Sequence, residues 1–192
     1  RQMCIRDSLI DSKTNTNIGK SPLFPKYETF ADFLSNTIIG KRKHTISEFF
    51  YRTQHIQQLG GYQIYPAGYY ADDASILLFC NNNGIASTEE SLIVYRKSEN
   101  NISSSSCWNV EKSKAALKYY QWIIDEFPMK QQDEQIIQQR LDFDLYTYFS
   151  AALNIHQSIQ LLNCIPVNIW NWKKKLLCLY KFILNSYAKQ IK

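Results

Sequence analysis

Residues 59–73 read Leu-Gly-Gly-Tyr-Gln-Ile-Tyr-Pro-Ala-Gly-Tyr-Tyr-Ala-Asp-Asp, and this stretch decides how the first half of the chain is interpreted. The pattern before it predicts a brief helix over 52–59, which the Gly60-Gly61 pair ends. Residues 62–71 have no periodicity and predict a loop. Asp72 and Asp73 predict the start of a second helix, because carboxylates complement the positive end of a helix.

The segments on either side of this stretch alternate between helical and strand patterns. Upstream, a helix is predicted over 26–39 and a short strand over 46–51, whereas 1–24 predict no regular element. Downstream, Asn83-Gly84 ends the helix that begins at Asp72, and Ser91–Arg96 is the strongest strand pattern of the chain.

The pattern of apolar residues changes after residue 107. Residues 109–190 carry apolar side chains at helical spacing, interrupted by Pro128 and Pro166, and a last helix is predicted over 168–189. We therefore expect an α/β fold, with a mixed part over residues 1–107 and a helical extension over residues 108–192.

The composition excludes several classes of protein. Of the 192 residues, 45% are hydrophobic and 20% are charged, which argues against a disordered chain. Residues 168–192 hold six lysines and no acid, so the net charge of +5 comes from this tail and not from the whole surface. A nucleic-acid-binding surface over the whole chain is therefore not expected.

The five cysteines and three histidines are scattered and form no Cys-x-x-Cys pair, so neither a zinc module nor a disulfide framework is predicted. Reduced thiols indicate a cytoplasmic protein, and the sequence contains no signal peptide or membrane-spanning stretch. Because the first residue is Arg and not Met, we expect the chain to be a piece of a longer protein.

Adjacent carboxylates at a helix start point in different directions, so they need not share one task. One carboxylate is able to cap the helix while the other faces a cleft and removes a proton from an alcohol. The alternative is that both acids only cap the helix. A hydrolase that uses both carboxylates ranks last, because neighbouring residues are poorly placed to flank one bond.

The order Phe50-Tyr51-Arg52, Leu59-Gly60-Gly61-Tyr62, Asp72-Asp73, Asn83-Gly84 and Tyr95-Arg96 resembles the C-terminal half of a family 2 glycosyltransferase of the GT-A fold. The resemblance covers roughly residues 20–107. It implies inverting transfer of a sugar from a nucleotide-sugar donor to a hydroxyl of a saccharide or lipid-linked acceptor. It also implies a role in surface polysaccharide biosynthesis.

The resemblance also implies roles for single residues. Asp73 matches the second acid of the family's pair, which is the catalytic base, and Asp72 stands where the family usually has Glu. Gly60, Gly61, Tyr62 and Arg96 match positions near the substrates. The complete enzyme is expected to use a divalent metal, Mg²⁺ or Mn²⁺, whose Asp-x-Asp ligand motif is absent from the matching region of this chain.

We reject Asp142-Phe143-Asp144 as that motif, because it lies inside a helical pattern far beyond the acidic pair. The chain is therefore interpreted as an acceptor-side fragment without the donor-binding half. The alternative is a non-catalytic helical interaction module whose acidic pair only caps a helix.

The basic tail has two interpretations. Its lysines alternate with large apolar residues at helical intervals: Trp170, Trp172, Leu176, Leu177, Tyr180, Ile183, Leu184 and Tyr187. Such a helix is able to lie on an anionic membrane surface, here the inner face of the cell membrane. The alternative is a terminal helix that packs its apolar stripe on its own domain.

Overall fold

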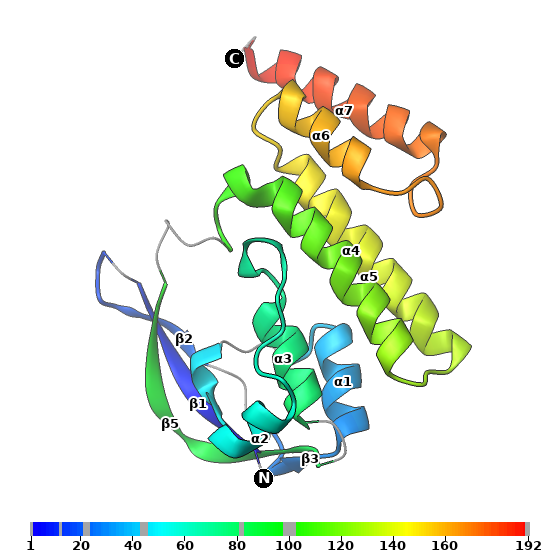
Figure 1. Ribbon diagram of the computed structural model, residues 1–192. Helices are drawn as coiled ribbons and strands as arrows, with labels where there is room; N and C mark the ends of the chain where they lie inside the picture. The colour runs from blue at the N-terminus through cyan, green and yellow to red at the C-terminus, as the bar shows by residue number, and fades with distance from the viewer. Residues whose placement is uncertain are drawn as a thin grey trace. The chain divides into compact units, whose positions relative to one another are not determined.

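The computed structural model describes residues 2–11, 13–20, 24–42, 46–80, 83–97 and 103–190. Within these ranges, the side chains of 2–11, 20, 46, 89–93, 95–97 and 185–190 are not described. The contacts divide the chain into two compact units (Figure 1). The first contains Arg1–Ile64 and Tyr70–Asn101, and the second contains Tyr65–Tyr69 and Ile102–Lys192. Residues 102–107, which the sequence analysis groups with the first part, thus belong to the second unit.

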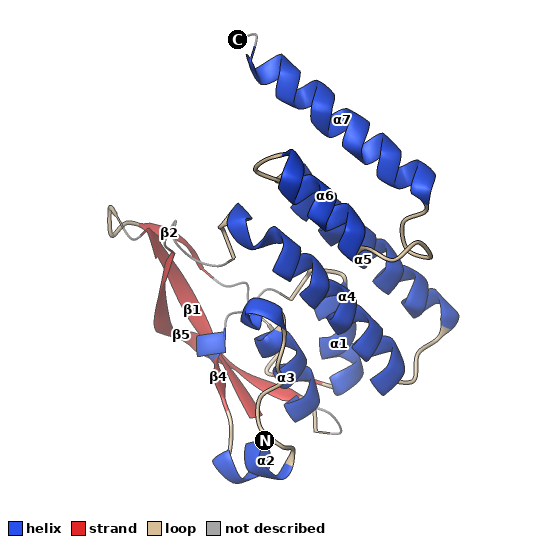
Figure 2. Cartoon of the chain, turned by 45° about the horizontal axis from the view of Figure 1, so that its top comes forward, coloured by secondary structure: helices blue, strands red, loops and turns tan. Residues whose placement is uncertain are grey.

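The first unit contains a mixed β-sheet (Figure 2). Its strands are β1 (Gln2–Asp11), β2 (Asn17–Lys20), β3 (Tyr27–Glu28), β4 (Phe49–Phe50) and β5 (Ile85–Lys97). The order is β2-β1-β5-β3, with β4 also paired to β1. β1 and β5 run parallel, and the other described pairs are antiparallel.

The sheet corrects two predictions and extends a third. Residues 1–24 were expected to hold no regular element, which is wrong because β1 and β2 lie there. The predicted strand over 46–51 is reduced to Phe49–Phe50. The predicted strand Ser91–Arg96 is part of the longer β5. Helices and a sheet together agree with the α/β expectation in its coarse form.

Three helices accompany this sheet: α1 (Phe30–Ile38), α2 (Thr53–Gln58) and α3 (Ala71–Cys80). α1 begins four residues later than predicted, because Tyr27 and Glu28 pair with β5 and Thr29 caps the helix. The Thr29 hydroxyl accepts a hydrogen bond from the backbone N–H of Asp32 at 3.2 Å, which satisfies one of the first N–H groups of the helix. The predictions of α2 and α3 are confirmed to within a residue or two.

The core of the first unit combines apolar side chains with a buried ion pair. Its largest fully buried apolar side chains among the described residues are Phe33, Ile76, Leu77, Phe79 and Ile85. Arg42 lies 3.0 Å from a carboxylate oxygen of Glu28, and both side chains are almost completely buried. The pair links β3 to the segment after α1. The two charges stay together because a buried charge without a partner is costly.

The turn between α3 and β5 depends on Gly84. Its N–H donates to the carbonyl oxygen of Cys80 at 2.9 Å, and its φ of +61° lies in the left-handed region. A Cβ atom at this position would collide with the backbone carbonyl oxygen of Glu28 and would lie 2.8 Å from the Tyr27 hydroxyl oxygen. Gly84 thus allows β3 to lie directly against the start of β5.

The second unit is helical and contains α4 (Asn109–Glu126), α5 (Gln131–Ser150), α6 (Ile155–Cys164) and α7 (Trp172–Gln190) (Figure 2). α4 ends before Pro128 and α6 ends before Pro166, as the sequence predicts. Most members of the predicted apolar stripes are buried: Ala115, Ala116, Tyr119, Tyr120, Ile123, Ile137, Leu141, Leu145, Tyr148 and Phe149. The exceptions are Ile124, which is half-buried, and Ile136, which is 39% exposed.

The tail does not pack as its second interpretation requires. Trp170 is completely buried, but six other members of the stripe are exposed: Trp172, Leu176, Leu177, Tyr180, Ile183 and Leu184. The side chain of Tyr187 lies outside the described residues. The prediction that this apolar stripe packs on its own domain is therefore wrong for most of the stripe residues. In the part of the chain that the structure describes, no helix has the length and apolar character needed to cross a membrane.

Candidate functional site

α2 and the segment before it are fixed to α3 through Phe79. The Tyr51 ring meets the Phe79 ring edge to face, with centroids 5.1 Å apart. His55 Nε2 lies 3.0 Å from the backbone carbonyl oxygen of Phe79 and forms a hydrogen bond with it. Phe79 itself is completely buried. These contacts set where the chain leaves α2 and enters the Gly-Gly turn.

The turn after α2 requires glycine for its backbone conformation. Gly60 and Gly61 have φ angles of +82° and +87°, which other L-residues rarely adopt. The Gly61 N–H donates to the Ile56 carbonyl oxygen at 2.9 Å and closes the helix end. No atom lies within 4 Å of a Cβ built at either position, so the bare backbone borders open space.

The residues that follow the turn pack on α3. The Tyr62 ring contacts Phe79 edge to face, with centroids 5.5 Å apart, and the residue remains 50% exposed. The Gln63 N–H donates to Ser75 Oγ at 2.8 Å, and Ser75 Oγ donates to the Ala71 carbonyl oxygen at 2.5 Å. Together these contacts hold the Gly-Gly-Tyr segment beside the first two turns of α3.

Asp72 and Asp73 lie in the first turn of α3, and both are partly exposed. Helical spacing places Asp72 on the same face as Ser75 and Phe79, the residues that hold the Tyr62–Gln63 segment. Asp73 shares a face with Leu77, which is completely buried. The two carboxylates thus leave the helix in different directions, as expected for neighbours, and Asp72 is the one on the face that carries the loop.

The remaining predicted site residue, Arg96, is placed only by its backbone. It lies in β5, where its Cα pairs with that of Ile10 in the parallel strand β1. Its side chain lies outside the described residues, so its expected place near the substrates stays a prediction.

Two other tyrosines of the loop, Tyr65 and Tyr69, pack in the helical unit. Tyr65 is 6% exposed, and its ring meets the Tyr119 ring at a centroid distance of 6.3 Å. Burial raises the pKa of Tyr65 to about 12. Tyr69 packs edge to face on Tyr148 at 6.0 Å. Of these rings, Tyr65 is buried, whereas Tyr62 is half exposed.

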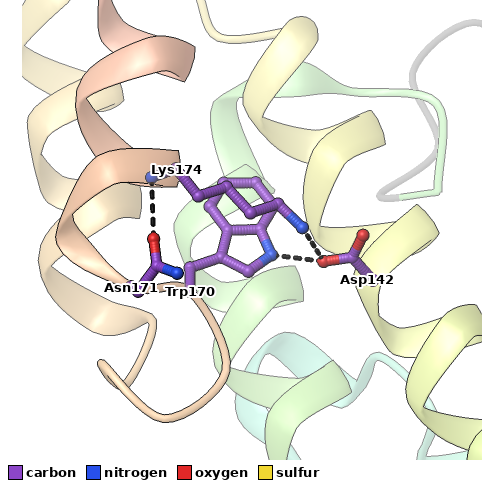
Figure 3. A network of polar contacts seen from close by, with 4 residues as sticks. All are labelled: Asp142, Trp170, Asn171 and Lys174. Carbon is purple, nitrogen blue, oxygen red and sulfur yellow. Dashed lines mark hydrogen bonds and ion pairs between the residues drawn. The ribbon is translucent and has the colours of Figure 1, made fainter.

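The sequence Asp142-Phe143-Asp144 lies within α5, where both acids have structural partners. Asp142 Oδ1 accepts hydrogen bonds from Trp170 Nε1 and Lys174 Nζ (Figure 3). Asp144 accepts a 2.6 Å hydrogen bond from the Tyr120 hydroxyl. These contacts agree with the rejection of Asp142-Phe143-Asp144 as a metal motif.

No metal site is assembled by the residues that the structure describes. Among them, no three His, Cys, Asp or Glu side chains are grouped closely enough to hold an ion. The resemblance assigns the divalent metal to an Asp-x-Asp motif that the matching region of this chain lacks, so this finding does not bear on that metal.

Sequence reasoning missed the three supports of the candidate site: His55, Ser75 and Phe79. Ser75 and Phe79 follow Asp72 at three and seven positions, the spacing of one helix face, so their placement was accessible from the pattern. The hydrogen bond of His55 joins residues 24 positions apart, and no local pattern predicts it.

Three comparisons with known proteins gave no match: no family model, no curated protein and no solved structure is similar to this chain.

Proposed function

We propose that this chain is the acceptor-side part of an inverting glycosyltransferase of the GT-A fold, in which Asp73 removes the proton of the acceptor hydroxyl. The observation that carries the proposal is the docking of the Gly60-Gly61-Tyr62 turn beside the acidic first turn of α3, through the Gln63–Ser75 hydrogen bond. The sequence resemblance requires these two motifs to be neighbours, although nine residues separate them.

The reaction needs a base and an open approach for the acceptor. The acceptor oxygen attacks the anomeric carbon of the donor sugar and gives its proton to the Asp73 carboxylate. The bond from that carbon to the nucleotide breaks at the same time, and the nucleotide leaves with the bonding electrons. The partial exposure of Asp73 and the bare backbone at Gly60 and Gly61 support access of a hydroxyl-bearing substrate.

Asp72 and Tyr62 have supporting tasks in this proposal. Asp72 lies on the face of α3 that carries the Tyr62–Gln63 segment, so it orients this loop or accepts a hydrogen bond from the acceptor. The Tyr62 ring is fixed by Phe79 on one edge and half exposed, which suits stacking against an apolar face of a sugar ring. Arg96 is assigned to phosphate charge on the strength of the resemblance alone.

The donor and its divalent metal are assigned to an N-terminal half of the GT-A domain. No step above uses groups of this chain to hold a metal or a nucleotide. The acceptor is a saccharide or a lipid-linked sugar, as expected for surface polysaccharide biosynthesis at the cytoplasmic face of the membrane.

The first test measures transfer. The chain is joined behind the donor-binding half of a family 2 glycosyltransferase and supplied with nucleotide sugars, Mg²⁺ or Mn²⁺ and saccharide acceptors, and the released nucleotide is measured. Loss of a general base lowers the rate by about 10²–10⁴-fold, so Asp73→Asn is expected to fall by this amount. Asp133→Asn, an exposed acid in the first turn of α5, is the matched control and keeps its rate. Unchanged turnover of Asp73→Asn overturns the base assignment.

The second test uses the chain alone. Titration with saccharides, followed by amide NMR, is expected to shift the resonances of Gly60, Gly61, Tyr62 and Asp73. Absence of shifts with every saccharide contradicts an acceptor site. Tight calorimetric binding of a nucleotide sugar by the isolated chain contradicts the assignment of the donor to another half.

The rival function is a non-catalytic interaction module whose acids only cap α3. The exposed apolar side chains of α7 favour it, because such a surface is typical of an interaction site. In that case Asp73→Asn affects the stability of α3 and leaves every binding activity of the chain unchanged.

A further inference from the structure

α7 is attached to the rest of the helical unit by one side only. Cys178 on this side is 5% exposed, and Phe182 packs on Phe149 with centroids 6.2 Å apart. The Lys175 ammonium donates to the carbonyl oxygens of Leu162 and Ile165 at the end of α6, at 2.6 and 2.5 Å. These contacts determine which side of α7 faces inward.

The first turn of α7 is fixed in the same orientation. Lys174 Nζ and Trp170 Nε1 both donate to Asp142 of α5, while the Lys174 backbone N–H donates to Asn171 Oδ1 at 2.9 Å (Figure 3). Trp170 is completely buried, so the turn that precedes α7 is anchored in the core. The orientation of α7 about its own axis is therefore set by contacts on two other helices.

The outward side of α7, which we call the outer face, is apolar. It consists of Trp172, Leu176, Leu177, Tyr180, Ile183 and Leu184, which are 38–61% exposed. The spacing of three and four places these residues on one side of the helix. A surface helix normally turns its polar side to water, and a contiguous exposed apolar patch marks a site of interaction.

The charges around the outer face select the kind of partner. Residues 168–192 hold six lysines and no acid. Lys174 and Lys175 are used in the inward contacts. Lys173, on the outer side at the start of α7, and Lys181, at the edge of the outer face, are both exposed. Two copies of this face would bring like charges together without an acid from the same segment, which disfavours self-association. An anionic lipid surface accepts both the apolar side chains and the lysines.

We propose that α7 lies in the plane of an anionic bilayer, with its outer face inserted at the level of the lipid head groups. Trp172 and Tyr180 suit this depth, because their rings are apolar and carry one polar group each. Lys173 and Lys181 extend their ammonium groups to lipid phosphates. The inward contacts persist, so the helical unit stays folded while it is bound. This inference is independent of glycosyl transfer.

The test is sedimentation of the whole chain with vesicles of phosphatidylcholine alone or with 30% phosphatidylglycerol. The chain is expected to pellet with the anionic vesicles, less so at high salt, and to stay in the supernatant with the neutral ones. Replacing Trp172, Leu176 and Tyr180 by Ser abolishes pelleting. The matched control replaces Ile136, Phe143 and Tyr146 by Ser, three exposed apolar residues of α5 that are 39–59% exposed, and leaves pelleting intact.

The contribution of charge is measured separately. The double variant Lys173→Gln, Lys181→Gln is expected to weaken binding on the order of fivefold per lysine. A blue shift of tryptophan emission on anionic vesicles, lost in Trp172→Phe while pelleting persists, places the start of α7 in the lipid.

Three outcomes overturn the proposal. Equal pelleting of the parent chain and the α7 Ser variant shows that the outer face does not bind lipid. Equal pelleting with neutral and anionic vesicles removes the role of the lysines. Concentration-dependent dimerisation that the α7 Ser variant abolishes, without any vesicle binding, assigns the outer face to a second copy.

Discussion

The acid pairs Asp72-Asp73 of α3 and Asp142/Asp144 of α5 differ in where they lie. Asp72 and Asp73 stand in the first turn of α3, partly exposed, beside a loop whose two glycines leave backbone bare. Asp142 and Asp144 lie in the middle of α5 and accept hydrogen bonds from side chains of α4, of α7 and of the turn before α7. Asp142 and Asp144 are structural, because neighbouring elements bring hydrogen-bond donors to them.

The largest loss of stability is expected at Trp170, the completely buried donor to Asp142. Trp170→Ala is expected to lower the free energy of unfolding by about 3–5 kcal/mol, because a large cavity remains in the core. Trp172→Ala, two residues away and 61% exposed, is expected to stay within about 0.5 kcal/mol. Denaturant unfolding followed by circular dichroism measures both. Equal losses would mean that the turn before α7 does not anchor the helix.

The second-largest loss of stability is expected for the Tyr120–Asp144 hydrogen bond. Tyr120→Phe removes the donor and leaves Asp144 less satisfied in a buried place, so we expect a loss of about 1–3 kcal/mol in the free energy of unfolding. Tyr146→Phe on α5, which is 45% exposed, is the control and is expected to be neutral. The same unfolding experiment checks it, and a neutral Tyr120→Phe would place Asp144 among the acids without a structural task.

The acids of α3 are expected to matter less for stability. Asp72→Asn and Asp73→Asn each remove one favourable charge at a helix start, which contributes about 0.3–1 kcal/mol. Amide hydrogen exchange of α3 measures the effect in the first unit. A loss above about 2 kcal/mol for Asp73→Asn would make this residue structural and would weaken its assignment as a base.

Alkaline pH tests the donor of the Tyr120–Asp144 hydrogen bond, because it removes the proton of the Tyr120 hydroxyl. Burial, and then the negative charge of Asp144, raise the pKa of Tyr120, and burial raises the pKa of Tyr65 to about 12. A tyrosine that holds its proton more tightly when folded stabilises the fold below its ordinary pKa of about 10, and this stabilisation is lost as the pH rises further. Stability should therefore fall above pH 10, and Tyr120→Phe should flatten the decline. All four tryptophans lie in the helical unit, so tryptophan fluorescence follows it. A decline of the same steepness in Tyr120→Phe would contradict this origin.

The elements that local signals specify could be predicted from the sequence. α3 begins one residue before its acids and ends at Cys80, shortly before Gly84, and α4 ends before Pro128. Charge, backbone freedom and the proline ring all act within a few residues. β1 could not be predicted, since its pairing with β5 joins segments some 80 positions apart in the chain.

Trp170 shows why the tail was harder to interpret. Its spacing groups it with the outer face, but the chain turns before α7 begins, and the Trp170 N–H donates to the Pro166 carbonyl oxygen at 3.0 Å. That turn directs the indole into the core, while the helix that follows turns its similar side chains outward. A helical pattern predicts which residues share a face. The turn before the helix determines whether that face points into the core or toward the solvent.

The candidate site was predictable as a set of motifs, and their proximity was not. Asp72 and Asp73 were located from the helix start, and Gly60-Gly61 from the end of α2. The Gln63–Ser75 hydrogen bond that joins them depends on how a loop without periodicity folds back on α3.

The three glycines around this site differ in what they tolerate. In a library of all single substitutions, positions 60 and 61 would admit small residues such as Asn, at the cost of a strained backbone, because the space around them is empty. Position 84 would admit none, since even a methyl group meets the backbone of β3. Survivors of a selection for folding alone would therefore read glycine at 84 alone among the three.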